Sequence, residues 1–250
     1  MNITFIGESS CIPDVGREMA CFLINGKHLV DTGWCAALTM RQYGFDPLKL
    51  ESVMLTHLHQ DHYIGLPHVL FFIGLRKPKK PESPPLHLIG PGEHLERVVK
   101  AAVEFLQTPR FPELAVNYRL APLTPGDGLE LPDLRLETFP ARHVSGHNRV
   151  EQALVYKVTE KGSGACVAFT GDTHYHPPIA EFVKGVPLLI HDGAHTSAKD
   201  AATIAKTAGV GKLMLIHYLQ GHAEQLLAEA KAVFLSTELA KAGSTVAVSG

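Results

Sequence analysis

The sequence predicts an α/β fold built on mixed β-sheets, in one domain over residues 1–250. Its 250 residues, 45% hydrophobic and 19% charged, suffice for a substantial core. Short apolar runs alternate along the chain with segments of helical periodicity. Several apolar runs are joined by hairpin turns, so we expect antiparallel strand pairs beside parallel ones.

The first half of the chain carries clear local signals. Asn25-Gly26 between the β-rich runs 19–24 and 28–31 is a strong hairpin signal. Apolar residues at helical spacing predict a helix over 93–107. The other expected elements are strands over 2–6 and 52–56, a helix over 35–43, an apolar helix-like run ending at 75, a surface loop over 78–85, and a strand over 86–89 stopped by Gly90-Pro91-Gly92.

The second half is expected to contain short strands and two long helices. Thr196 or Ser197 would cap a helix that runs to Ala208, with Gly209 as its stop. A last helix is expected over 223–239. The expected strands are several short ones between 114 and 158, and strands over 165–170, 186–190, 213–216 and 245–248.

Composition excludes several classes of protein. A net charge of -2 gives no global basic field for nucleic acid. The four cysteines form no CxxC pair, which argues against a structural zinc cluster and a disulfide framework. No apolar run reaches the roughly 18 residues of a membrane span, and residues 1–7 lack a signal-peptide pattern. We therefore expect a cytoplasmic protein without a membrane partner.

The segment from Thr56 to His62 holds four potential metal ligands within six residues: His57, His59, Asp61 and His62. It follows the apolar run 52–55, which predicts a buried strand. His57 and His59 would point to the same side of an extended chain. Imidazole and carboxylate groups so close together predict a site for one or two divalent cations.

Further candidate ligands stand at the ends of other predicted strands: Asp31, Asp172, His191, His217 and, after a proline turn, His143. Strand ends share one edge of a sheet, so these side chains are expected to converge. The order strand, Asp, helix, strand, His occurs twice and suggests two similar halves. Thiolates are absent from the set, which favours Zn²⁺, Mn²⁺ or Fe.

The resulting ligand set is larger than one metal ion needs. Seven such groups are more than the four ligands that a tetrahedral zinc takes. We therefore expect two ions with a bridging carboxylate, holding a hydroxide between them. Metal binding gives such a nucleophile at neutral pH, so the sequence predicts a hydrolase without an activated Ser or Cys.

The segment from Thr56 to His62 resembles the HxHxDH motif of the metallo-β-lactamase superfamily. Asp31-Thr32-Gly33, His143, Phe169 to Thr173 and Leu215 to His217 follow in that superfamily's order. The resemblance covers essentially the whole chain and implies a four-layer αββα sandwich of two mixed β-sheets, with the site at one edge. It implies that His57, His59 and His143 hold one ion, that Asp61, His62 and His217 hold the other, that Asp172 bridges them, and that Asp31 orients ligands.

A narrower likeness is to the ribonuclease Z branch. Residues 57–66 and 86–91 are similar to it, and 195–202 resemble its HST motif and helix. In that branch a histidine assists the scissile phosphate and a glutamate orients it. By this likeness His195 is a candidate catalytic residue together with Asp61, and Asp192 is the nearest acidic partner. A protonated His195 would donate to an oxyanion or to the leaving group.

Two departures from this branch argue against tRNA as the substrate. The interval from His143 to Asp172 leaves space for a hairpin but not for the branch's tRNA-gripping arm. The arginine expected after His217 is absent, and His222 is a candidate substrate contact in its place. His174 and His176, beside Asp172, are candidates for lining the pocket. For His147, near His143, the sequence leaves a substrate contact and a surface position open, as it does for His222.

The favoured function is a metal-dependent phosphodiesterase acting on a small or short phosphodiester. The alternative is a hydrolase of carboxylic esters, lactones or thioesters on the same site. A second alternative is a non-catalytic metal-binding protein. Zinc is the expected ion, and the sequence leaves the natural substrate and the oligomeric state open, a homodimer included.

Overall fold

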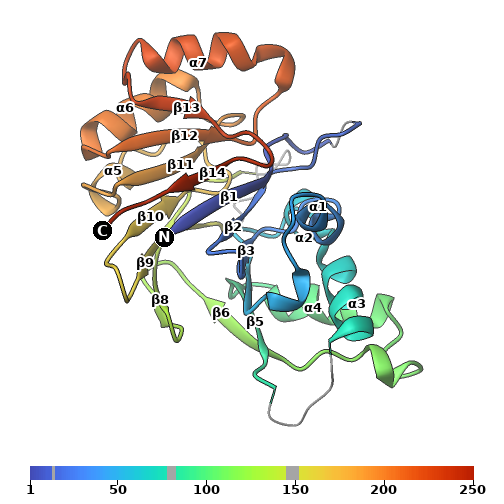
Figure 1. The fold of residues 1–250 in the computed structure, drawn as a ribbon. Helices are drawn as coiled ribbons and strands as arrows, with labels where there is room; N and C mark the ends of the chain where they lie inside the picture. Colours follow the sequence, from blue (N-terminus) through green and yellow to red (C-terminus); the bar gives the residue numbers. More distant parts are fainter. Residues whose placement is uncertain (13–14, 78–82, 145–151) are drawn as a thin grey trace.

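The computed structural model describes residues 1–12, 15–77, 83–144 and 152–250, and within them the strands form two seven-stranded sheets (Figure 1). The first sheet has the order β14-β1-β2-β3-β4-β5-β6 and the second β13-β12-β11-β10-β9-β8-β7. The first comprises β1 (Asn2–Gly7), β2 (Cys21–Ile24), β3 (His28–Val30), β4 (Ser52–Met54), β5 (Leu86–Pro91), β6 (Tyr118–Leu123) and β14 (Thr245–Ala247). The second comprises β7 (Gly128–Glu130), β8 (Leu134–Pro140), β9 (Leu154–Glu160), β10 (Cys166–Phe169), β11 (Leu188–Asp192), β12 (Lys212–Ile216) and β13 (Thr237–Leu239).

The two sheets repeat one topology. Strands β1, β2 and β3 pair antiparallel, and β3, β4, β5 and β6 then pair parallel. Strands β8, β9 and β10 pair antiparallel, and β10, β11, β12 and β13 then pair parallel. The mixed sheets predicted from the sequence are confirmed. The aspartates of the sequence echo follow β3 and β10, which hold equivalent places in the two sheets.

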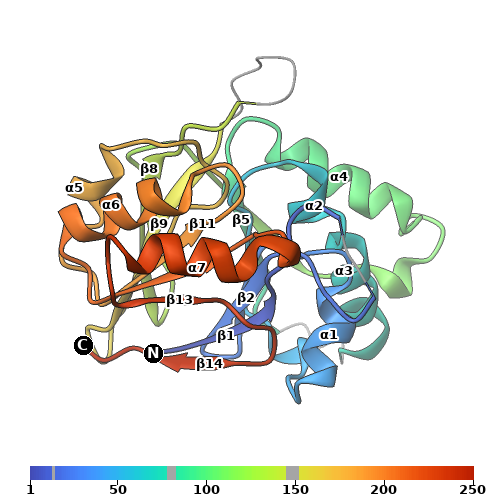
Figure 2. The ribbon, with the colours of Figure 1, turned by 90° about the horizontal axis from the view of Figure 1, so that it is seen from above.

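Helices cover the outer face of each sheet (Figures 1 and 2). The first sheet carries α1 (Ala36–Gln42), α3 (Leu66–Arg76) and α4 (Leu95–Phe105), with the short α2 (Gln60–Tyr63) beside them. The second carries α5 (Ile179–Phe182), α6 (Ala198–Ala208) and α7 (Ala223–Lys231). Short 3₁₀ turns are η1 (Pro47–Lys49), η2 (Pro112–Leu114) and η3 (Gln220–His222).

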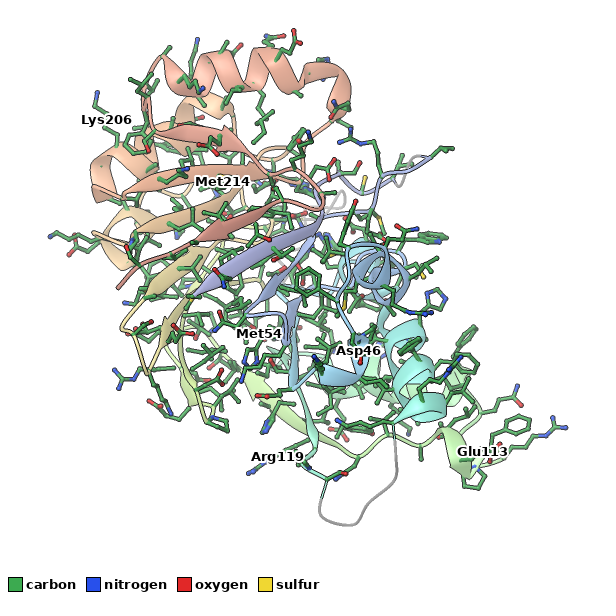
Figure 3. The ribbon with its side chains drawn as sticks, viewed as in Figure 1. Asp46, Met54, Glu113, Arg119, Lys206 and Met214 are labelled. Carbon is green, nitrogen blue, oxygen red and sulfur yellow. The ribbon has the colours of Figure 1, made fainter. Side chains whose placement is uncertain are left out.

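Alternation along the strands separates three apolar layers. Met54 of β4 and Met214 of β12, both labelled in Figure 3, are buried in the layer between the sheets. Val53 faces the layer under α1, α3 and α4, and Leu213 faces the layer under α5 and α6. The arrangement is helix, sheet, sheet, helix, so the predicted αββα sandwich is confirmed.

Two predicted boundaries are wrong. The last helix ends at Lys231, and Thr237–Leu239 forms β13, which pairs with β12 through Thr237 and Leu213. Strand β5 does not stop at Gly90, because Gly90 and Pro91 continue the parallel pairing with β6. Both errors arise from partners distant in sequence.

The described part of the chain contains no helix long and apolar enough to cross a membrane. That residues 1–250 form one domain stays a prediction.

Candidate metal centre

The segment from Thr56 to His62, here called the ligand-rich motif, follows β4. His57 and His59 lie on the connection after this strand, and Asp61 and His62 lie in the first turn of α2. Asp31, at the end of β3, fixes this connection from behind. Its Oδ1 accepts from the Thr56 backbone N–H at 2.8 Å, and its Oδ2 lies 2.8 Å from His62 Nδ1. The opposite imidazole nitrogen of His62 is thereby directed into the site.

Three more predicted ligands come from the second sheet. His143 follows β8, Asp172 follows β10 and His217 follows β12. At the join of the two sheets, Gly171 has a φ of 55°, and a Cβ on it would stand 2.6 Å from Cβ of Thr56. Only glycine allows this approach, which brings Asp172 against the ligand-rich motif.

The first ligand group is His57, His59 and His143, whose ligand atoms lie within 4.8 Å of one another. His143 Nε2 is 2.8 Å from His59 Nδ1. The ring centroids of His57 and His143 are 4.7 Å apart. The group therefore combines side chains from the connection after β4 in the first sheet and the connection after β8 in the second.

The second group is Asp61, His62, Asp172 and His217, also within 4.8 Å. Asp61 Oδ2 is 3.2 Å from His62 Nε2 and 3.3 Å from His217 Nε2. Asp172 stands between the groups, because its Oδ2 is 3.7 Å from His57 Nε2 and 3.5 Å from His62 Nε2. The structure thus brings together all seven predicted ligands, and their role in binding metal stays a prediction.

Burial and mutual charge set the protonation of the metal-free site. Burial lowers the pKa of His57, and that of His143 to about 4, so both imidazoles are neutral at pH 7. Burial also acts to lower the pKa of His217, but nearby carboxylates, Asp172 first, outweigh it and raise that pKa to about 10. Burial would raise the pKa of Asp61, yet hydrogen bonds with His217 and His62 hold it far below its ordinary value.

This donor set fits divalent cations. His57 is 0% exposed, and its Nε2 atom is buried without a hydrogen-bond partner among the described residues. An orphaned buried nitrogen is costly unless a ligand takes its lone pair. Imidazole and carboxylate donors suit Zn²⁺, Mn²⁺ and Fe, as the sequence analysis expected.

A further pair faces the same site. His195 Nδ1 lies 3.1 Å from Asp192 Oδ2 and 3.5 Å from Asp172 Oδ2. Asp192 is 1% exposed, and its Oδ1 is 3.3 Å from His217 Nδ1. The His195 side chain is 31% exposed. Its hydrogen bond with Asp192 raises its pKa against the effect of burial, which favours the protonated imidazole.

The remaining candidate histidines fall in different places. His191 was expected to converge with the others, but it lies inside β11, is 0% exposed, and alternates with Asp192 so that it faces the α6 side. That expectation is wrong. His222 is exposed at the start of α7 and joins neither ligand group. His147 lies outside the described residues.

Sequence reasoning missed the residues that support the site from a distance. Glu8, 6% exposed, accepts through its backbone oxygen from the His217 N–H at 2.9 Å. This contact holds His217 at a φ of 61°. No local pattern marks Glu8, because the contact spans most of the chain. The supporting role of Thr56 could have been inferred from the sequence, because Thr56 lies inside the ligand-rich motif. Its hydroxyl donates to Asp31 Oδ2 at 2.9 Å.

A cluster of His28, Glu51 and Asp133 lies elsewhere and also has its ligand atoms within 4.8 Å. Here Lys27 Nζ is 3.2 Å from Glu51 Oε1 and 3.0 Å from Asp133 Oδ2. The ammonium group already neutralises the carboxylates, so this cluster is a salt-bridge network between the sheets.

Two mixed sheets under outer helices, with a His/Asp cluster where their strand ends meet, define the metallo-β-lactamase fold. A model of the Beta-lactamase superfamily domain matches residues 28–218. The chain belongs to this family, and the resemblance predicted from its sequence is confirmed.

Relatives and solved structures agree with this assignment. Ribonuclease BN of Escherichia coli O157:H7 is 25% identical over 299 residues, covering 96% of this chain and 97% of that protein. The human tRNase Z short form, ELAC1, superposes with a TM-score of 0.78 at 21% identity, covering 99% of both chains. YhfI from Bacillus subtilis, a metallo-β-lactamase fold protein, gives 0.77 at 22% identity, covering 98% of this chain and 99% of that one.

Proposed function

We propose that this chain is a binuclear, zinc-dependent phosphodiesterase that hydrolyses a small or short phosphodiester. The observation that carries the proposal is the place of His195. Its imidazole stands 3.5 Å from Asp172, beside two groups of candidate metal ligands, and its hydrogen bond with Asp192 favours the protonated form. A cation next to two metal ions suits the dianionic transition state of a phosphodiester better than the single negative charge of a carboxylic ester.

Each residue of the site has a proposed task. His57, His59 and His143 would hold one ion, Asp61, His62 and His217 the other, with Asp172 between them. Bound ions would supply Lewis acidity and lower the pKa of water at neutral pH. Asp61, ionised because its pKa is lowered, would also accept a hydrogen bond from the attacking water. His195, oriented by Asp192, would protonate the leaving oxygen.

The length of the chain favours a small substrate over tRNA. The Ribonuclease BN alignment spans 299 positions, of which this chain fills 96% of its 250 residues, so about 59 positions have no counterpart here. Between His143 and Asp172 the described residues form only the β9–β10 hairpin. The chain thus lacks the length for an added substrate-gripping arm. The cytoplasmic location expected from the sequence stays a prediction.

The test compares substrate classes with metal-loaded protein. Bis-p-nitrophenyl phosphate, a p-nitrophenyl carboxylic ester and a lactone panel are assayed side by side. We expect turnover of the phosphodiester, and a loss of more than about 100-fold in His59→Ala, since removing even a group that supports a metal ligand costs up to that much. His94→Asn is the control, because His94 is exposed, belongs to neither ligand group, and has a φ of 80° that asparagine tolerates. Ester or lactone turnover with every phosphodiester inert would reverse the proposal.

A further inference from the structure

His174 stands at the mouth of the site, two residues after Asp172. Its ring centroid is 6.3 Å from that of His143 and 5.8 Å from that of His195. The rings of His143 and His195 are themselves 5.1 Å apart. The three imidazoles therefore neighbour one another beside the ligand groups, and His174 lies next to both His143 and His195.

The backbone of His174 is held in place by two other loops of the site. Its N–H donates to the Arg142 carbonyl at 2.7 Å. The Arg142 N–H donates to the Thr173 hydroxyl at 3.1 Å, and the Thr196 hydroxyl donates to the Thr173 carbonyl. The ring is thus carried on a turn tied to both the His143 and the His195 connections, and such preorganisation is what a substrate-binding group needs.

The ring itself has an unmet hydrogen-bonding capacity. Nδ1 of His174 is buried and has no hydrogen-bond partner among the described residues. A structural histidine normally satisfies such an atom, because leaving it unpaired costs free energy. His195 differs, since its Nδ1 is used on Asp192. Among the described residues, His174 thus keeps a ring nitrogen beside the cluster without a protein partner.

The partner is not a metal ion of the two ligand groups either. His174 belongs to none of the described clusters whose ligand atoms lie within 4.8 Å of one another. Neighbouring His176 has a different environment, with its ring 6.1 Å from that of Phe139, which stacks on Phe182 of α5. His174 is therefore the one of these two that shares the space in front of the ligands.

We infer that His174 binds the substrate by donating a hydrogen bond to a non-bridging phosphate oxygen, beside His195. This rests on the proposed phosphodiesterase function and adds a residue that sets substrate affinity. His195 would act on the leaving oxygen and His174 on an oxygen that keeps its charge throughout. Because the His174 contact exists in the bound substrate as well as in the transition state, its loss should appear mainly in KM.

The experiment uses the zinc-loaded full chain with three variants: His174→Ala, His174→Asn and, as control, His94→Asn. With bis-p-nitrophenyl phosphate, His174→Ala should raise KM about 10- to 100-fold, the range for a hydrogen bond to a charged group, with a smaller change in kcat. Competitive inhibition by inorganic phosphate should weaken by the same factor. His174→Asn keeps an N–H donor and should recover most of the loss, and the control should match the wild type.

Metal content and thermal melting of each variant decide between binding and structure. An unchanged KM and phosphate inhibition at full metal content would overturn the inference. Loss of bound zinc in His174→Asn would also overturn it, since the residue would then support the metal ions. If the wild type hydrolyses no phosphodiester, the proposed function fails instead, and calorimetric titration with inorganic phosphate still shows whether His174 binds the anion.

Discussion

The buried carboxylate of Asp31 makes three hydrogen bonds. It accepts from the Thr56 backbone and hydroxyl, and it holds His62 Nδ1 at 2.8 Å. A residue that orients a ligand ring in this way also decides which nitrogen carries the proton. We therefore expect Asp31 to affect metal binding without contacting an ion itself.

Replacing Asp31 by asparagine should lower zinc affinity about 10- to 100-fold, as for other groups that orient a metal ligand. The φ of 53° at this position is one that asparagine tolerates. The amide, however, would turn an N–H toward either Thr56 N–H or His62, so one contact is lost. Competition with a chromophoric chelator measures the affinity. In Asp46→Asn, the same change at an exposed carboxylate that accepts from Leu48 N–H, affinity should not move; equal losses in both variants would refute the role of Asp31.

Individual site residues were predictable where the signal is local. The spacing from His57 to His62 places four candidate ligands within six residues. Helix α6 begins after the Ser197 cap and ends before Gly209, as expected. His191 was misjudged because one residue of strand alternation separates it from Asp192, which faces the site. A one-residue uncertainty in where β11 ends is enough to turn a candidate ligand into a core side chain.

At the scale of elements, the join between the ligand-rich motif and the Asp172 turn depends on Gly171. Its left-handed φ of 55° would strain any other residue, and a Cβ would meet Thr56 at 2.6 Å. Gly209, at the end of α6, has a similar φ of 65° but nothing within 4 Å of an added Cβ. Comparing substitutions at the two glycines therefore distinguishes the cost of the left-handed backbone from the cost of the close contact with Thr56.

We expect Gly209→Ala to lower the free energy of unfolding by about 1–2 kcal/mol from the left-handed conformation alone. Gly171→Ala should lose that amount and about 1–3 kcal/mol more from the forced contact. It should also weaken zinc binding, because the Asp172 turn must move. Urea denaturation of metal-free protein gives the first two values. An equal loss of unfolding free energy in both variants would show that the contact with Thr56 does not destabilise the protein.

Elements whose ends depend on distant partners could not be placed from sequence. The segment 223–239 has continuous helical propensity, yet the helix stops at Lys231 because Thr237–Leu239 pairs with β12. Gly90 and Pro91 look like a stop and instead extend β5 along β6. Hairpins and caps, by contrast, are decided by adjacent residues, and the Asn25-Gly26 turn was located correctly.

At the scale of the whole molecule, the candidate ligands come from both sheets, which have the same topology. His57, His59, Asp61 and His62 follow β4 of the first sheet, whereas His143, Asp172 and His217 follow strands of the second. A cation bound here contacts residues that are far apart in the unfolded chain. Binding to the native state alone stabilises it by about 2.7 kcal/mol when the free ion is at 100 times Kd.

Chelation should therefore lower the melting temperature, by about 5–10 °C if 1 kcal/mol corresponds to roughly 2–4 °C in a chain of this size. The size of this shift should depend on pH. In metal-free protein the pKa of His217 is raised from 6.5 to about 10. The stability that its charge contributes is fully present below pH 6.5 and is lost as pH rises through 10.

Metal binding must displace this same proton, so it becomes tighter as pH rises. As pH rises, the metal-free protein therefore loses stability, whereas tighter zinc binding offsets this loss in the loaded protein. The difference in melting temperature between zinc-loaded and chelated protein should thus widen from pH 6.5 to 8.5 in differential scanning calorimetry. In His217→Asn the widening should shrink without vanishing. Burial acts to lower the pKa of His62, but Asp172 and Asp31 outweigh it and raise that pKa, so His62 still releases a proton to the competing metal ion. His94→Asn should behave as the wild type. A difference that stays constant or narrows with pH would mean that no proton at His217 competes with the metal ion.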